Sequence, residues 1–167
     1  MDEDKKAQLR RYNRNIRMSG SVVIVYGVWS VIKFIVPILF GTINVAQMLG
    51  ADEEEFKEYG WFAIIIIIIM LGIILLVHVL IGRGAINYST GKKKSRLFFV
   101  GALIFFGFTL CSIYQYGDDI KNVRYLEDID ETLAAIMMDL TFLFVLFDLM
   151  RSTIKVSGYR KLEDSEK

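Results

Sequence analysis

The sequence predicts an all-α integral membrane protein with four transmembrane helices, and three observations lead to this class. Of the 167 residues, 54% are apolar, although the chain also carries 20 basic and 19 acidic side chains. Those charges are gathered in blocks between long apolar runs, whereas a soluble protein would intersperse them. One run, residues 61–81, contains six consecutive isoleucines and is long enough to cross about 30 Å of hydrocarbon as a helix.

Residues 1–19 form a basic segment ahead of the first apolar run. Leu9, Tyr12 and Ile16 fall at i, i+3 and i+7, a narrow apolar stripe on a helix otherwise covered by cations. One interpretation is an amphipathic interfacial helix lying on an anionic leaflet; the other is a solvated basic tail that only sets the topology. The cations that would face lipid are four arginines of this segment and three lysines of the middle loop: Arg10, Arg11, Arg14, Arg17, Lys92, Lys93 and Lys94.

Four apolar runs are the predicted transmembrane helices: residues 20–41, 61–81, 97–116 and 132–150. The first is expected to be a retained signal anchor, because it is longer than the apolar core of a usual signal peptide and lacks an A-x-A cleavage pattern. The transmembrane domain therefore covers residues 20–150, and a charged tail follows at residues 151–167.

The charges of the connecting segments predict the orientation. The segments 1–19, 82–96 and 151–167 together carry 16 cations and 6 anions, whereas the loops 42–60 and 117–131 carry 3 cations and 11 anions. By the positive-inside rule the basic segments are cytoplasmic, so both termini lie inside and the acidic loops outside. We expect the plasma membrane as the location, with anionic lipid at the cytoplasmic face as a partner.

Four ionisable side chains lie within the predicted spans, where each costs at least about 2.5 kcal/mol at a helix centre: Lys33, His78, Asp139 and Asp148. Lys33 and Asp139 are at similar depth, which predicts an interhelical ion pair between the first and fourth spans. Such a pair either fixes helix packing alone or takes part in transport or gating. His78 and Asp148 also match in depth, but near the cytoplasmic boundary, where side chains can reach water unaided.

The first span places further polar features on the face of Lys33. Tyr26, Ser30, Lys33 and Pro37 repeat at i, i+4, i+7 and i+11. Pro37 is expected to bend the helix and to release the carbonyl of Lys33, because proline has no N–H and clashes with the carbonyl four residues back. This bend would serve a gate or binding site, or only helix packing.

No catalytic or metal-binding constellation is visible in the sequence. One histidine and one cysteine leave little room for a zinc site, and no serine or cysteine has a base beside it. Asp139 and Asp148 are nine residues apart, on opposite faces of a helix, so they cannot form a carboxylate pair. We therefore expect no enzymatic activity, no cofactor, no metal and no nucleic-acid partner.

Three functions remain compatible with the sequence. The favoured one is a non-enzymatic subunit or scaffold of a membrane complex, in which the Lys33 and Asp139 pair is structural. On the third span, Gly107 and Cys111 have small-xxx-small spacing, which suggests a close helix contact, within the bundle or between subunits. The alternatives are a homo-oligomeric ion channel and a small proton-coupled transporter that uses Lys33, Asp139 and His78.

Overall fold

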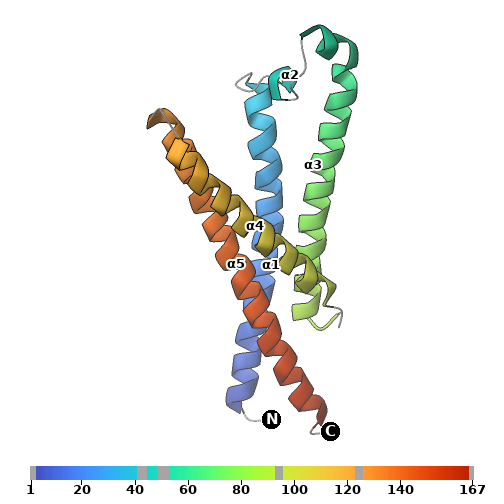
Figure 1. Ribbon diagram of the computed structural model, residues 1–167. Coiled ribbons are helices and arrows are strands. Elements are labelled where there is room, and N and C mark those ends of the chain that lie inside the picture. The colour runs from blue at the N-terminus through green and yellow to red at the C-terminus, as the bar shows by residue number, and fades with distance from the viewer. Residues whose placement is uncertain (1–2, 41–44, 49–52, 93–95, 123–125, 166–167) are drawn as a thin grey trace. The chain divides into compact units, whose positions relative to one another are not determined.

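The computed structural model describes residues 3–40, 45–48, 53–92, 96–122 and 126–165, and all regular structure in these ranges is helical. The helices are, in chain order, α1 (Glu3–Leu39), α2 (Val45–Met48), α3 (Glu53–Ser89), α4 (Leu97–Asn122) and α5 (Leu126–Ser165) (Figure 1). All except the short α2 contain segments that are long and apolar enough to cross a membrane. The predicted all-helical class and the four apolar helices are thus confirmed.

The helices extend well beyond the predicted spans. α3 continues from residue 81 to Ser89, and α5 continues from residue 150 to Ser165. An α-helix satisfies its backbone hydrogen bonds internally whether its side chains are apolar or charged. The only proline of the chain lies in α1, so nothing in these polar extensions breaks the helix. Apolar composition therefore marks the span but not the end of the helix.

Residues 3–19 of the N-terminal segment form the first part of α1. Ile16 is fully buried, and the ring of Tyr12 stacks on that of Tyr159 in α5 with centroids 6.2 Å apart. The hydroxyl of Tyr159 also donates a hydrogen bond to Oε1 of Gln8. The apolar stripe of residues 3–19 therefore makes contacts within unit 1, and its predicted placement on a lipid surface stays a prediction.

The chain divides into two compact units. Unit 1 contains residues 1–23 and 80–167, and unit 2 contains residues 24–79. Within unit 1, α4 and α5 lie side by side as a hairpin, with the ring of Phe105 edge-on to that of Phe142 at 6.5 Å (Figure 1). Unit 2 consists of the later part of α1, α2 and most of α3.

Glycines let the helices approach one another closely. In unit 1, a Cβ atom added to Gly20 of α1 would lie 2.9 Å from the carbonyl oxygen of Gly82 and 3.0 Å from Cβ of Ala85, both in α3. In unit 2, a Cβ atom on Gly27 would lie 2.5 Å from Cβ of His78. Small residues at helix crossings are the usual packing device of membrane bundles, where lipid supplies no hydrophobic driving force.

A glycine ends α3. Gly91 has a φ of 75°, and its N–H donates to the carbonyl of Tyr88 while the N–H of Lys92 donates to the carbonyl of Asn87. This pair of bonds is the Schellman motif, which satisfies the last carbonyls of a helix and favours glycine at the left-handed position. α3 thereby ends, and α4 begins at Leu97, directly after Arg96 and six residues after Gly91.

The outward surface of the long helices is apolar. Ile65 and Ile68 of the isoleucine block are 44% and 62% exposed, and Phe108 of α4 is 69% exposed. Monomeric soluble proteins rarely expose continuous apolar surface of this extent. The surface suits a hydrocarbon solvent, and the four apolar helices indicate a membrane protein.

Candidate functional site

Asp148 of α5 is the centre of a polar cluster in unit 1. Ser19 of α1 donates its Oγ hydrogen to Oδ2 of Asp148 at 3.0 Å, and Ser152 approaches Oδ1 at 3.5 Å from one turn further along α5. Ser19 and Ser152 are both buried. The carboxyl group thus has local hydroxyl donors within the bundle, as buried polar groups require.

Asp139 lies on the other side of α5. Its Oδ2 accepts a hydrogen bond of 3.0 Å from Ser112 Oγ of α4. Since Asp148 contacts α1 and Asp139 contacts α4, the two carboxyl groups face different helices, as their nine-residue spacing predicts. They cannot share a proton as a carboxylate pair does.

Unit 2 contains the other polar residues of the predicted spans. The rings of Tyr26 and His78 lie 6.0 Å apart, and Nδ1 of His78 is 2.7 Å from the carbonyl oxygen of Ile74. Ser30 donates to the carbonyl oxygen of its own helix, at Tyr26. Lys33, one turn further on, has an exposed side chain.

Pro37 lies in the last turn of α1, which ends at Leu39. The next N–H groups resume helical bonding, since Phe40 donates to the carbonyl of Val36 at 3.0 Å. Only two helical residues follow the proline, so a bend at this position changes the direction of only the last turn of α1. The proline therefore marks the approach to the helix end more than a hinge in the middle of a span.

The two predicted depth-matched pairs remain predictions. Lys33 and His78 belong to unit 2, whereas Asp139 and Asp148 belong to unit 1. The contacts described above are all made within one unit or the other.

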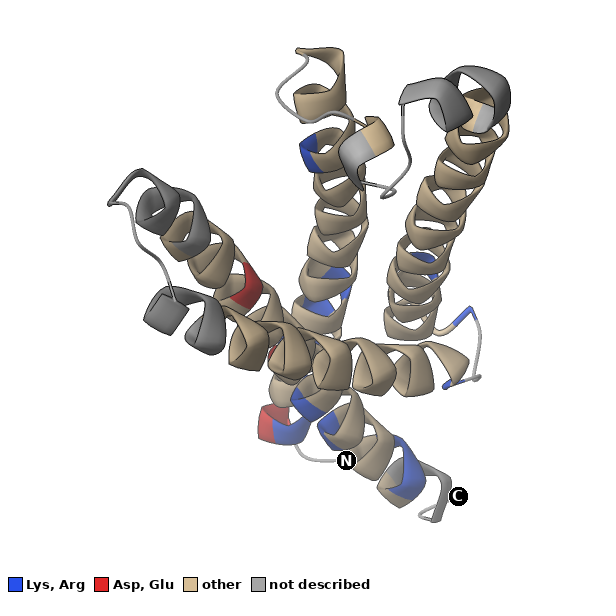
Figure 2. Cartoon of the chain, turned by 45° about the horizontal axis from the view of Figure 1, so that its top comes forward, with Lys and Arg blue, Asp and Glu red and all other residues tan. Residues whose placement is uncertain are grey.

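The predicted lipid-facing cations are exposed where the structure describes them. The side chains of Arg10, Arg11, Arg14, Arg17 and Lys92 are all exposed. Lys93 and Lys94 lie outside the described residues. Figure 2 shows Lys and Arg gathered on the N-terminal half of α1 and towards the C-terminal end of α5, both in unit 1.

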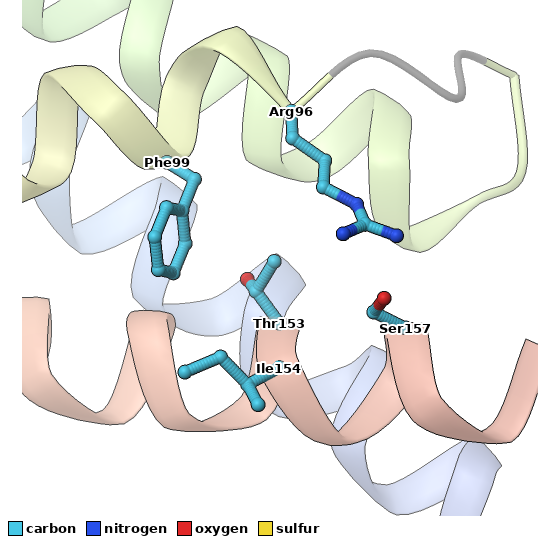
Figure 3. A pocket seen from close by; sticks show the side chains of 5 residues that line it. All are labelled: Arg96, Phe99, Thr153, Ile154 and Ser157. Carbon is cyan, nitrogen blue, oxygen red and sulfur yellow. The ribbon is translucent and has the colours of Figure 1, made fainter.

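A pocket between α4 and α5 was not predicted from the sequence. It has a volume of about 180 Å³ and is lined by Arg96, Phe99, Thr153, Ile154 and Ser157 (Figure 3). One side comes from the end of the middle loop and the start of the third span, and the other comes from the C-terminal tail. The only signal in the sequence is the i, i+4 spacing of Thr153 and Ser157, which places two hydroxyls on one face of a helix.

Unit 1 also contains a stack of one arginine and two aromatic rings. Arg160 of α5 donates from Nη2 to the carbonyl oxygen of Tyr88 at 2.9 Å, and its guanidinium carbon lies 4.5 Å from the centroid of the Tyr88 ring. That ring, 2% exposed, packs against Phe98 of α4 at 5.4 Å. Arg160 thereby joins α5 to the junction of α3 and α4.

The arrangement offers hydrogen bonding and packing within the bundle. Among the described side chains, no three His, Cys, Asp or Glu residues are grouped so that they could hold a metal ion. The sequence matches no known family model, and neither curated proteins nor solved structures give a match.

Proposed function

We propose that this protein is a non-enzymatic subunit or scaffold of a membrane complex, with both termini cytoplasmic, and that it binds a partner transmembrane helix on the outer face of α4. Five exposed residues define this outer face, at spacings of four, three, four and three: Val100, Ile104, Gly107, Cys111 and Tyr114. A stripe with this period is the seam that a second helix packs against.

The observation that carries the proposal is the open space over Gly107. A Cβ atom added there would meet nothing within 4 Å in the described chain, whereas one added to Gly101 of the same helix would lie 2.8 Å from the Ile81 side chain. Gly101 thus serves packing within unit 1, and Gly107 does not. With Cys111 one turn away, Gly107 leaves a shallow notch in which another backbone can approach closely.

The polar residues of the spans support a structural role over a catalytic one. Asp148 and Asp139 both accept hydrogen bonds from serines of neighbouring helices. Hydrogen bonds of this kind commonly hold membrane bundles together. The proposed pair of Lys33 and Asp139 would add an ion pair to the same packing.

Replacement of Gly107 by leucine tests the proposal, with Gly72→Leu as a matched control. Gly72 also has nothing within 4 Å of an added Cβ, so both changes gain the same side chain without a clash inside the chain. Each variant is extracted from its native membrane into lipid nanodiscs, and the mass and composition of the complex are measured. We expect Gly107→Leu to lose the partner and Gly72→Leu to keep it. A complex of unchanged mass with Gly107→Leu contradicts the proposal.

The same measurement separates the alternatives. A closed ring of this chain alone favours the homo-oligomeric ion channel and calls for conductance measurements with variants of Tyr26, Ser30 and Lys33. A single copy that transports solute in response to a pH gradient, and stops on Asp139→Asn, favours the proton-coupled transporter. One copy bound to a larger membrane protein supports the proposed subunit.

A further inference from the structure

The pocket between α4 and α5 is lined by one cation, Arg96, and by no acidic side chain. Figure 3 shows the guanidinium of Arg96 and the hydroxyl of Ser157 directed toward one another across it. Arg96 stands immediately before α4, whose first turn is closed by a hydrogen bond of 2.8 Å from the N–H of Phe99 to the carbonyl of Arg96. The pocket therefore lies at the N-terminus of a 26-residue helix, where the helix dipole is positive.

Ser157 provides an independent indication of a ligand. Its side chain is 8% exposed, yet its hydroxyl has no hydrogen-bond partner within the described residues. Its neighbour Thr153 behaves differently, because Oγ1 of Thr153 donates to the carbonyl oxygen of Leu149 at 2.7 Å. A serine in a helix can make the same bond to its own backbone, so Ser157 instead offers its hydroxyl to the pocket.

The charge around the pocket selects an anion. No acidic side chain lines it, and the whole segment 82–96 contains five cations and no acid. Arg96 presents a planar fork of donors that matches the oxygens of a phosphate group. The volume, about 180 Å³, is about six times the share of one water molecule, roughly 30 Å³. That is ample for a tetrahedral anion with part of its organic substituent.

We propose that this pocket binds a phosphate group, held by the Arg96 guanidinium, the Ser157 hydroxyl and the N-terminus of α4. Phe99 and Ile154 supply apolar walls, and Ile154 is 61% exposed at the rim. A phosphate ester with an apolar substituent fits this combination, either as a phospholipid headgroup or as a soluble phosphate compound. The inference is independent of the partner helix on α4, because all five lining residues are distinct from that face.

The binding test uses the full chain in maltoside micelles, which contain no phosphate. Three probes are added in turn: phosphatidylglycerol, followed by native mass spectrometry; diacylglycerol, as the matching lipid without phosphate; and inorganic phosphate, followed by calorimetric titration. We expect phosphatidylglycerol to bind and diacylglycerol not to bind. Displacement of the lipid by inorganic phosphate assigns the site to soluble phosphate compounds, whereas resistance to it assigns the site to a lipid headgroup.

Two variants and two controls locate the binding. Arg96→Gln and Ser157→Ala should each weaken phosphatidylglycerol binding by about tenfold or more, since each removes a hydrogen bond to a charged group. Lys92→Gln removes the same charge from an exposed side chain outside the pocket, and Ser89→Ala removes a hydroxyl that already bonds the carbonyl of Ile86. Both controls should bind as the wild type does.

Two results would overturn the inference. One is binding by Arg96→Gln and Ser157→Ala at wild-type strength. The other is an equal loss in Arg96→Gln and Lys92→Gln, which would show diffuse attraction to a basic surface and no built site. Because Ser157→Ala removes one buried hydroxyl and leaves the backbone unchanged, it keeps the test decisive if Arg96→Gln fails to fold.

Discussion

Ser19 of α1 and Asp148 of α5 are 129 positions apart in the chain, and a hydrogen bond of 3.0 Å joins their side chains. Ser19 is buried, and Asp148 also lies within 3.5 Å of the hydroxyl of Ser152. The bond therefore fixes which face of α1 meets α5. It also explains how a carboxyl group near the end of a predicted span is accommodated without a cation.

A double-mutant cycle on Ser19→Ala and Asp148→Asn should give a coupling free energy of about 0.5–1.5 kcal/mol, the net contribution of a typical hydrogen bond in a protein. Unfolding of the purified protein in mixed micelles measures each corner of the cycle. Thr141→Ala is the control partner, because the Thr141 hydroxyl bonds only the carbonyl of Met137 in its own helix. Strict additivity for Ser19 and Asp148 would show that the bond contributes nothing.

Gly27→Ala should destabilise the protein by about 1–3 kcal/mol, as overpacking of a tight contact does. The added Cβ would lie 2.5 Å from Cβ of His78, and a Cβ atom cannot move away by changing rotamer. Gly72→Ala is the matched control and should be neutral or slightly stabilising, since its Cβ meets nothing. Equal stability of the two variants, measured by unfolding in micelles, would contradict the close approach of α1 and α3.

Arg160→Lys should loosen the C-terminal part of α5 almost as much as Arg160→Ala. The guanidinium both donates to the carbonyl of Tyr88 and stacks over its ring, and an ammonium group cannot do both with the same geometry. We expect faster amide hydrogen exchange around residues 156–162, with a loss of about 1–2 kcal/mol. The exposed Lys161 provides the control, and its alanine variant should exchange as the wild type does.

The proposed pair of Lys33 and Asp139 makes a prediction about single and double changes. Replacing either member of the pair by leucine leaves the other charge without its ion-pair partner, which is destabilising. Replacing both removes the pair and the cost together, so the double variant should be more stable than either single one. Single variants whose effects add up in the double variant would rule out the pair.

Much of the fold was predictable because span length and hydrophobicity are local properties. The third apolar run was predicted to begin at Leu97, and α4 begins there. The continuations of α3 to Ser89 and of α5 to Ser165 were not predicted, because charged residues can be helical or extended with little difference in local propensity. The role of Gly91 in ending α3 was not predicted either, because it depends on the left-handed conformation of a single residue.

The polar contacts were less predictable than the helices. Sequence reasoning identified Asp139 and Asp148 as residues that need partners, but their serine partners, Ser112 and Ser19, come from helices far away in the chain. Serine and glycine occur throughout the chain, and only three-dimensional packing distinguishes the buried ones. The close contacts of α1 and α3 illustrate this, since Gly107 drew attention in the sequence whereas Gly20 and Gly27 make the contacts.

The turn at Gly91 also bears on the order in which the protein assembles during its synthesis. α3 and α4 are joined by a short connection, and their contacts, such as that of Tyr88 with Phe98, span only ten positions of the chain. Closing so short a loop costs little entropy, so this hairpin can pack as soon as α4 has emerged from the ribosome. Ser19 is synthesised 129 residues before Asp148, so the bond between them forms only after α5 has been made. Until then the side of α1 that faces α5 lacks this partner.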